Sequence, residues 1–151
     1  MIVDSHQHFW KLSRGDYEWM SPEFKKIYRD FSPSDLEPLI EESGVTNTII
    51  VQAAATIEET QFMLNIANQT SFVSGIVGWV NFESTNVEND IDQLSLDPLL
   101  KGFRPMIHDI SDKNWMLRDS LRHGLNHMIT KNLSFDALVR PHHLPNLYKF
   151  A

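Results

Sequence analysis

Two histidines near the start of the chain have the type and spacing of a metal-binding or catalytic pair. The segment "DSHQHFW" places His6 and His8 on either side of one residue, at the end of the first apolar run. Successive side chains of a strand point to opposite faces, so both imidazoles are expected on one face, together with Asp4. Converging neutral imidazoles can bind a divalent metal, and a metal-bound water is a strong hydrolytic nucleophile. The alternative is a pair of structural histidines.

The composition limits the chemistry and the partners that the chain can have. The 151 residues include seven histidines and no cysteine, so a transition-metal site must use imidazole and carboxylate ligands. The net charge of -7 argues against nucleic acid as a partner. Without an apolar run of ~20 residues or a secretory signal, we expect a cytoplasmic protein with no membrane partner. Residues 1–151 are expected to form a single domain.

The elements that must position the histidines alternate between predicted strands and predicted helices. Expected N-caps are Ser34 and Thr56, the latter in a capping box with Glu59, and Gly44 is the expected end of the first helix. The predicted strands cover 1–9, 45–54, 72–82, 100–109 and 133–141, and the predicted helices cover 35–44, 56–70, 86–96, 114–132 and 142–151.

On most of these strands the polar residues occupy alternate positions, so they lie on one face of the strand. This pattern favours a barrel over an open sheet. The strands of an open sheet covered by helices on both sides are apolar on both faces, whereas the inner face of a barrel can lead to a polar active site. No glycine-rich phosphate loop follows the first strand. We therefore expect an α/β, TIM-barrel-like (β/α)8 fold with about five of its eight units present. The polar positions are Asp4, His6, His8, Thr48, Gln52, Arg104, His108, Ser134, Asp136 and Arg140.

Six ordered stretches resemble amidohydrolase family 2, and in particular its L-fucono-1,5-lactonase-like branch. They read "DSHQHFW", "DLEPLIEESGV", "VQAAAT", "GIVGWVNF", "LKGFRPMIHD" and "FDALVRP", and the resemblance covers essentially the whole chain. It implies a metal-dependent hydrolase of carbohydrate catabolism that opens a small-molecule sugar lactone with metal-activated water. It also implies that His6 and His8 are catalytic residues and ligands of a divalent metal, most simply zinc.

Further candidate residues follow from the same resemblance and from side-chain chemistry. Arg104 and His108 are candidate catalytic residues, although relatives carry glutamine at the position of His108. The candidate substrate-binding residues are Trp10, Gln52, Arg104 and Arg140: a guanidinium can bind a carboxylate or sugar hydroxyls, and an indole can stack on a sugar.

Each candidate also has a structural alternative. Arg104 could pair with Asp136, and Arg140 could be a solvated loop residue. Aromatic residues of the loop after the first strand could roof a sugar pocket or simply pack over the barrel mouth. These loop residues are Trp10, Tyr17 and Trp19.

The other histidines fit structural positions better than a metal site. His123 and His127 fit the outer face of a helix, and His142 and His143 fit the start of a helix.

The length leaves several hypotheses open, because family members are nearly twice as long. The histidine of strand six and the aspartate of strand eight, the usual general base, have no counterpart here. The chain could be a fragment, a truncated gene product or a half-barrel completed by a second copy as a homodimer. Functional alternatives are a non-catalytic half-barrel and a metal-free lactonase of aromatic dicarboxylates, in which the histidines would bind the carbonyl or move protons.

Overall fold

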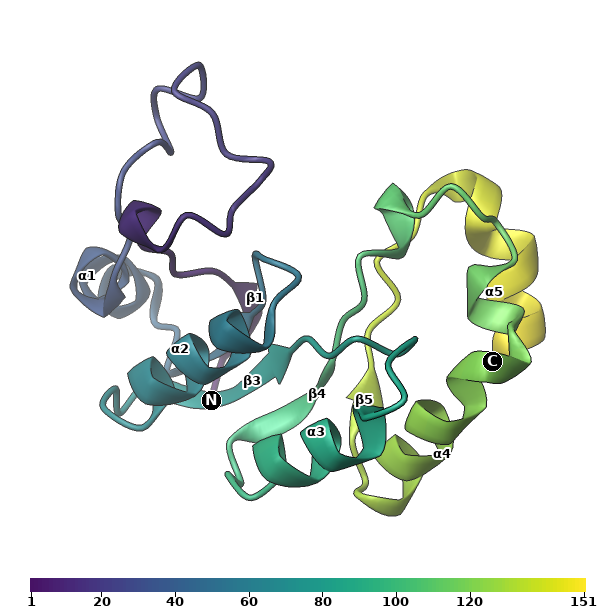
Figure 1. The fold of residues 1–151 in the computed structure, drawn as a ribbon. Helices are drawn as coiled ribbons and strands as arrows, with labels where there is room; N and C mark the ends of the chain where they lie inside the picture. Colours follow the sequence, from purple (N-terminus) through teal and green to yellow (C-terminus); the bar gives the residue numbers. More distant parts are fainter.

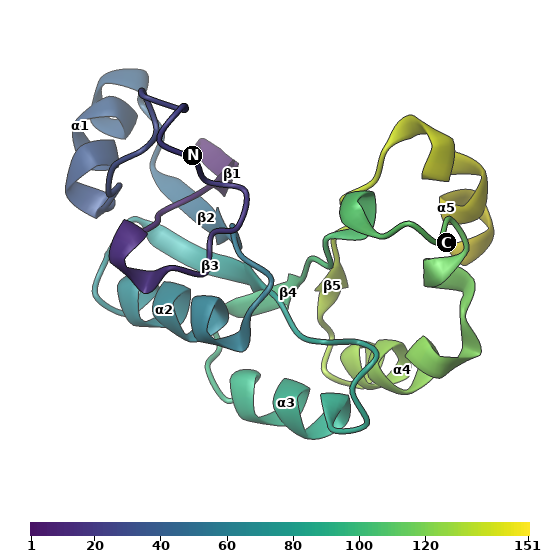
Figure 2. The same cartoon turned by 45° about the horizontal axis from the view of Figure 1, so that its top comes forward.

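A curled sheet of five parallel strands organises the chain, whose residues 1–151 are all described by the computed structural model. The strands lie side by side in chain order from β1 to β5, and Figures 1 and 2 show the sheet in two orientations. This arrangement confirms the predicted α/β class and the partial barrel. The strands are β1 (Val3–Gln7), β2 (Asn47–Val51), β3 (Val73–Gly78), β4 (Leu100–Phe103) and β5 (Ser134–Phe135).

Most helices follow the outer side of the sheet, the last helix lies beside the C-terminal loops, and long loops rise from the carboxyl ends of the strands (Figures 1 and 2). The longest loop joins β1 to the first helix and carries most of the aromatic residues of the N-terminal part. None of the helices is both long and apolar enough to cross a membrane. The helices are α1 (Pro33–Ser43), α2 (Ile57–Ala67), α3 (Val87–Leu94), α4 (Arg122–Thr130) and α5 (Leu144–Phe150).

The helix ends differ in part from the predicted caps. Helix α1 has Ser32 rather than Ser34 as its N-cap, because Asp35 completes a capping box with Ser32. Gly44 ends α1 in the left-handed conformation, with φ 70°, as predicted. Thr56 caps α2 as predicted by accepting a hydrogen bond from the Glu59 amide at 3.0 Å. The Glu59 carboxylate, however, turns away from the cap and binds the Ala53 amide.

All five strands are shorter than predicted, so His8 and Gln52 lie just after β1 and β2, and the early ends of β4 and β5 move further candidate residues off the sheet. Strand β4 ends at Phe103, just before Arg104 and Pro105, because proline has no amide hydrogen to continue the ladder. His108 therefore lies in a single 3-10 turn rather than on the strand. Strand β5 ends at Phe135, so Arg140 lies on the following segment. The predicted helix over 114–132 begins with two 3-10 turns and becomes α-helical only at α4.

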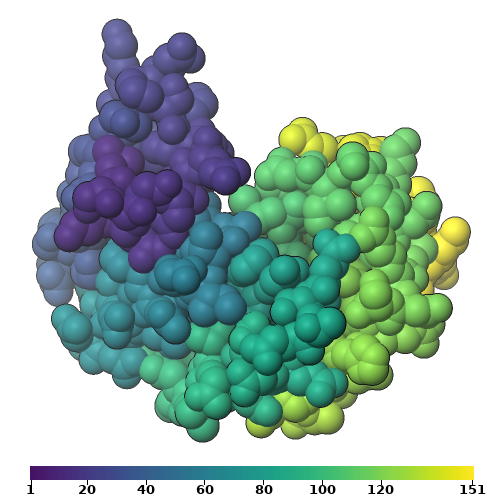
Figure 3. All heavy atoms as spheres, in the orientation of Figure 1, coloured from purple at the N-terminus to yellow at the C-terminus, as the bar shows by residue number.

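One continuous apolar core joins the outer face of the sheet to the helices. Ile50, Ile76 and Phe103, from three neighbouring strands, have no exposed surface. The same core extends to Trp115 and Met128 in the C-terminal part. Above this base, Figure 3 shows a hollow between the purple loop after β1 and the green and yellow C-terminal segments. The carboxyl ends of the strands thus open into a space flanked by two groups of loops.

Candidate active site

The two predicted histidines meet at the carboxyl end of β1. The Nε2 atoms of His6 and His8 lie 3.2 Å apart. Nδ1 of His8 is 2.7 Å from the carbonyl oxygen of Val51, which can only accept, so this nitrogen carries the proton. The Nε2 lone pair of neutral His8 is therefore free. Burial lowers the pKa of His8 to about 4, although the hydrogen bond to Val51 acts to raise it. The ring is therefore neutral near pH 7.

Arg104 joins this pair from the residue after β4. Its Nη1 atom donates to Nε2 of His6 at 3.2 Å, and its Nη2 atom donates to the carbonyl oxygen of Gln52. The Gln52 amide donates in return to the Arg104 carbonyl oxygen at 2.7 Å. Burial is the main cause that lowers the pKa of His6, and the positive charge of Arg104 lowers it further. Arg104 forms no ion pair with Asp136, so its guanidinium fork is committed to the histidine and to the backbone of Gln52.

A cleft of about 470 Å³ opens beside these groups. Four predicted site residues line it, His8, Trp10, Arg104 and His108, whereas His6 and the fully buried Gln52 lie outside the lining. A neighbouring cavity of about 350 Å³ is lined in part by the same residues. The residues common to both cavities are Trp19, Ala53, Met106 and Asp109.

The other candidate cations have structural partners outside the cleft. Arg140 donates from Nε to the His108 carbonyl oxygen at 3.1 Å and does not line the cleft. His127, on α4, lies 2.9 Å from Asp92. Nδ1 of the buried His143 accepts the Arg140 amide at 3.0 Å. These positions agree with the structural alternatives for His127, His143 and Arg140.

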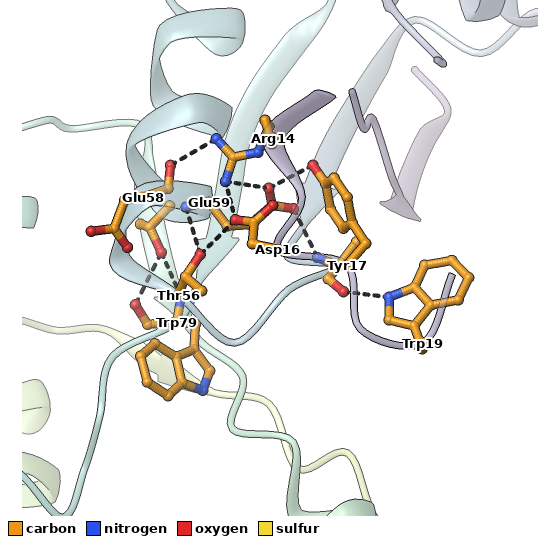
Figure 4. A network of polar contacts seen from close by, with 10 residues as sticks. Arg14, Asp16, Tyr17, Trp19, Thr56, Glu58, Glu59 and Trp79 are labelled. Carbon is orange, nitrogen blue, oxygen red and sulfur yellow. Dashed lines mark hydrogen bonds and ion pairs between the residues drawn. The ribbon is translucent and has the colours of Figure 1, made fainter. Parts of the chain in front are cut away.

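A buried acidic network beneath the loop after β1 was not predicted from the sequence. Figure 4 shows Glu59 of α2 at its centre, together with Arg14, Asp16 and Tyr17 from the loop. The pattern marked Glu59 only as a capping residue. A usable signal was its position four residues before Met63, on the face of α2 that packs against the sheet.

The histidine pair fits part of a metal site. A tetrahedral zinc ion with Zn–N bonds of about 2.0–2.1 Å needs nitrogens about 3.3 Å apart, and the two Nε2 atoms are 3.2 Å apart. No group of three or more histidine, cysteine or carboxylate side chains is arranged to hold a metal. The chain thus offers two imidazole ligands, and a cationic guanidinium lies beside one of them.

Comparison with known proteins gives these observations a family context. No protein-family model matches the chain. It is 45% identical to an L-fucono-1,5-lactonase of Burkholderia ambifaria over 149 residues, which are 99% of this chain and 51% of the relative. The L-fucono-1,5-lactonase of Burkholderia multivorans is 29% identical and is covered to 50% of its length. A crystal structure of an amidohydrolase from Burkholderia multivorans with bound zinc superposes with a TM-score of 0.91, at 28% identity, over 99% of this chain and 53% of that one.

The chain is homologous, along nearly its whole length, to part of these proteins. It spans about half the length of the curated relatives it matches. A probable 2-pyrone-4,6-dicarboxylic acid hydrolase of Acinetobacter baumannii has a TM-score of 0.73 at 17% identity, which shows a shared fold alone. The predicted family resemblance and barrel-type fold are confirmed, while the roles of individual site residues stay predictions.

Proposed function

We propose that this amidohydrolase homologue hydrolyses a sugar lactone similar to L-fucono-1,5-lactone. The observation that carries the proposal is the cluster of His6, His8 and Arg104 at the carboxyl ends of β1 and β4, beside a cleft with aromatic walls. Its curated relatives bear the name L-fucono-1,5-lactonase. Because the chain spans about half of each relative, the activity of the whole protein is part of the proposal.

The proposed step uses a neutral imidazole and a buried cation. A water molecule gives a proton to Nε2 of His8 while its oxygen bonds to the lactone carbonyl carbon. The carbonyl oxygen becomes an oxyanion, which the Arg104 guanidinium stabilises. Collapse of this intermediate breaks the bond to the ring oxygen, and the ring oxygen takes the proton from His8. The product is the open hydroxy acid, and His8 returns to its neutral form.

Aromatic walls are proposed to orient the sugar ring. Trp10 and Trp19 line the cleft with their rings 5.8 Å apart in an edge-to-face arrangement. Each indole N–H is already bonded to the protein, Trp10 to the Arg29 carbonyl and Trp19 to the Ala53 carbonyl. The indole faces and edges rather than their N–H groups are therefore what the walls offer to a substrate.

A divalent metal, most simply zinc, is proposed to bind the Nε2 atoms of His6 and His8; the lone pair of His8 would then be occupied, so the metal would replace His8 as the group that activates water. When bound, it would polarise the lactone carbonyl and lower the pKa of a water molecule. The bound zinc of the Burkholderia multivorans neighbour supports this assignment.

The proposed partner of the protein is a small-molecule lactone, and the proposed role is in carbohydrate catabolism. The cytoplasmic location and the homodimer stay predictions.

The proposal is tested by measuring acid release from L-fucono-1,5-lactone by the purified protein. Replacing both histidines, His6→Ala with His8→Ala, is expected to lower turnover by about a hundredfold or more, the usual loss when a general base is removed. His123→Ala is the matched control, since this side chain on α4 is 82% exposed and far from the cleft. Unchanged turnover in the double variant would contradict the assigned roles. No turnover by the unmodified chain would favour the non-catalytic half-barrel.

A further inference from the structure

Glu59 is a fully buried carboxylate that joins three separate parts of the chain. It lies in the first turn of α2 and has no exposed surface. One oxygen accepts the Ala53 amide at 3.0 Å, and the other accepts the Tyr17 hydroxyl at 2.9 Å. The second oxygen also lies 3.4 Å from Nη2 of Arg14. A single side chain thus links the end of β2, the start of α2 and the loop after β1.

The backbone of Ala53 connects Glu59 to the wall of the cleft. Its amide is held by Glu59, and its carbonyl oxygen accepts the indole N–H of Trp19 at 2.7 Å. Trp19 lines both the histidine cleft and the neighbouring cavity, as do Ala53, Met106 and Asp109, so its indole forms part of the wall that the two share. The position of the indole in this shared wall depends on where the Ala53 backbone is held.

A second set of contacts ties the same loop to α2 (Figure 4). Asp16 accepts the hydroxyl of Thr56 at 2.9 Å and pairs with Arg14. Arg14 also donates to the carbonyl oxygen of Glu58 at 3.3 Å, and its guanidinium lies 4.6 Å from the ring centroid of Phe62. The loop is therefore fastened by charged groups on the side away from the histidines, while its indoles reach the cleft.

We propose that Glu59 is a positioning residue that holds Trp19 in the wall shared by the two cavities. It acts through the Ala53 backbone and the Tyr17 hydroxyl, and touches no substrate. An effect of Glu59 on catalysis rests on the lactone hydrolysis proposed above. A buried ionic group is a poor way to gain stability, because removing it from water costs about as much as its pairing returns. The hydrogen bonds from the Ala53 amide and the Tyr17 hydroxyl, by contrast, fix where the loop that carries the indole lies relative to the end of β2.

The first test reads the position of Trp19 directly from heteronuclear NMR spectra of the four indole N–H groups. Glu59→Gln is the test variant, because an amide offers one acceptor oxygen where the carboxylate accepts from both Ala53 and Tyr17. Its exposed neighbour provides the matched control, Glu58→Gln. We expect Glu59→Gln to shift the Trp19 signal and leave that of Trp115, which lies in the core of the C-terminal part, unchanged.

A milder variant keeps the test valid if Glu59→Gln folds poorly. Tyr17→Phe removes one donor to Glu59 and keeps the ring, so we expect a smaller shift of the Trp19 signal. An unchanged Trp19 signal in both variants would overturn the proposal. Equal shifts of all four indole signals would also overturn it, because they would indicate a general loss of structure rather than the release of one wall.

The second test measures steady-state hydrolysis of L-fucono-1,5-lactone. Loss of one aromatic wall contact is expected to raise KM about two- to tenfold in Glu59→Gln, with kcat nearly unchanged. Glu58→Gln is expected to keep both constants. A fall in kcat at constant KM would overturn the positioning role. If the unmodified protein does not hydrolyse the lactone, the proposed function fails, and the indole signals still decide whether Glu59 positions Trp19.

Discussion

At the scale of single residues, Arg104 is the predicted site residue with the most unusual surroundings. Its side chain is buried, and it forms no ion pair with any carboxylate, because its donors go to His6 and to the Gln52 carbonyl. Burial lowers its pKa, and only the more distant charge of Asp136 opposes this. A buried cation without a paired anion is costly in free energy. Such a cation is well suited to stabilise negative charge that develops on a bound substrate.

Arg104→Lys tests this role of the guanidinium. Lysine keeps the charge but lacks the planar fork, so it cannot hold His6 and the Gln52 carbonyl together. Loss of one hydrogen bond from a charged group costs about 1.5–3 kcal/mol, which predicts a fall in kcat/KM of about ten- to a hundredfold. Arg122→Lys, at an exposed ion pair on α4, is the control and is expected to keep the wild-type rate. Equal rates in both variants would contradict the role of Arg104.

The sequence predicted the residues that strand parity controls and missed those that a loop controls. His6, His8 and Arg104 were predicted to share one face of their strands, and in the structure each lies at or just after the end of β1 or β4. The contact between Glu59 and Tyr17 depends on the path of the loop after β1, and no periodic pattern specifies that path. The network therefore became visible only in three dimensions.

At the scale of elements, close backbone approach defines the pairing of β4 with β5. Gly102 pairs with Ser134, and a Cβ atom on Gly102 would meet the carbonyl oxygen and the side chain of Ser134. Strand β5 pairs through only two residues, so it has little other hydrogen bonding to hold it. The last strand depends on the absence of a side chain on its neighbour.

Gly102→Ala is expected to lower the free energy of unfolding by about 1–3 kcal/mol or more, the usual cost of overpacking. Its control is Gly75→Ala on β3, where the new methyl group would meet mainly the side chain of Lys101, whose Cγ lies 2.6 Å away. Lys101 is exposed and can move aside, so we expect a smaller loss of stability. Urea titration of both variants measures the difference, and equal stabilities would argue against a tight β4–β5 contact.

Strand lengths show why the sequence placed some elements wrongly. The apolar pattern continues past Phe103 and Phe135, so it predicted strands that reach His108 and Arg140. Pro105 interrupts the first of these, and a 3-10 turn then carries His108. Alternation of apolar residues predicts which side chains are buried. It does not predict which backbone amide and carbonyl groups form hydrogen bonds with a neighbouring strand.

At the scale of the whole molecule, two groups of loops stand over one shared base. Figure 3 shows the hollow between them, yet the apolar core runs continuously from Phe9 to Met128 beneath it. Trp115 lies in this core below the C-terminal loops. The two sides of the cleft therefore have a common structural foundation.

A shared core predicts a single cooperative unfolding transition. Far-ultraviolet circular dichroism, which follows the helices, and fluorescence of the indoles are expected to give the same urea midpoint. A variant that retains only Trp115, with phenylalanine at the other three tryptophans, would report the C-terminal part alone. An earlier midpoint for that signal than for circular dichroism would show that this part unfolds separately.

The order of strands in the sheet also sets an order in which the site can be assembled. Every strand after β1 pairs with the one synthesised just before it, so the sheet can lengthen at one edge as the chain leaves the ribosome. His8 gains its Val51 partner once β2 has paired, whereas His6 receives Arg104 only after β4 has joined. A nascent chain therefore holds the imidazole pair before it holds the cation, and the arginine is the component that completes the cluster.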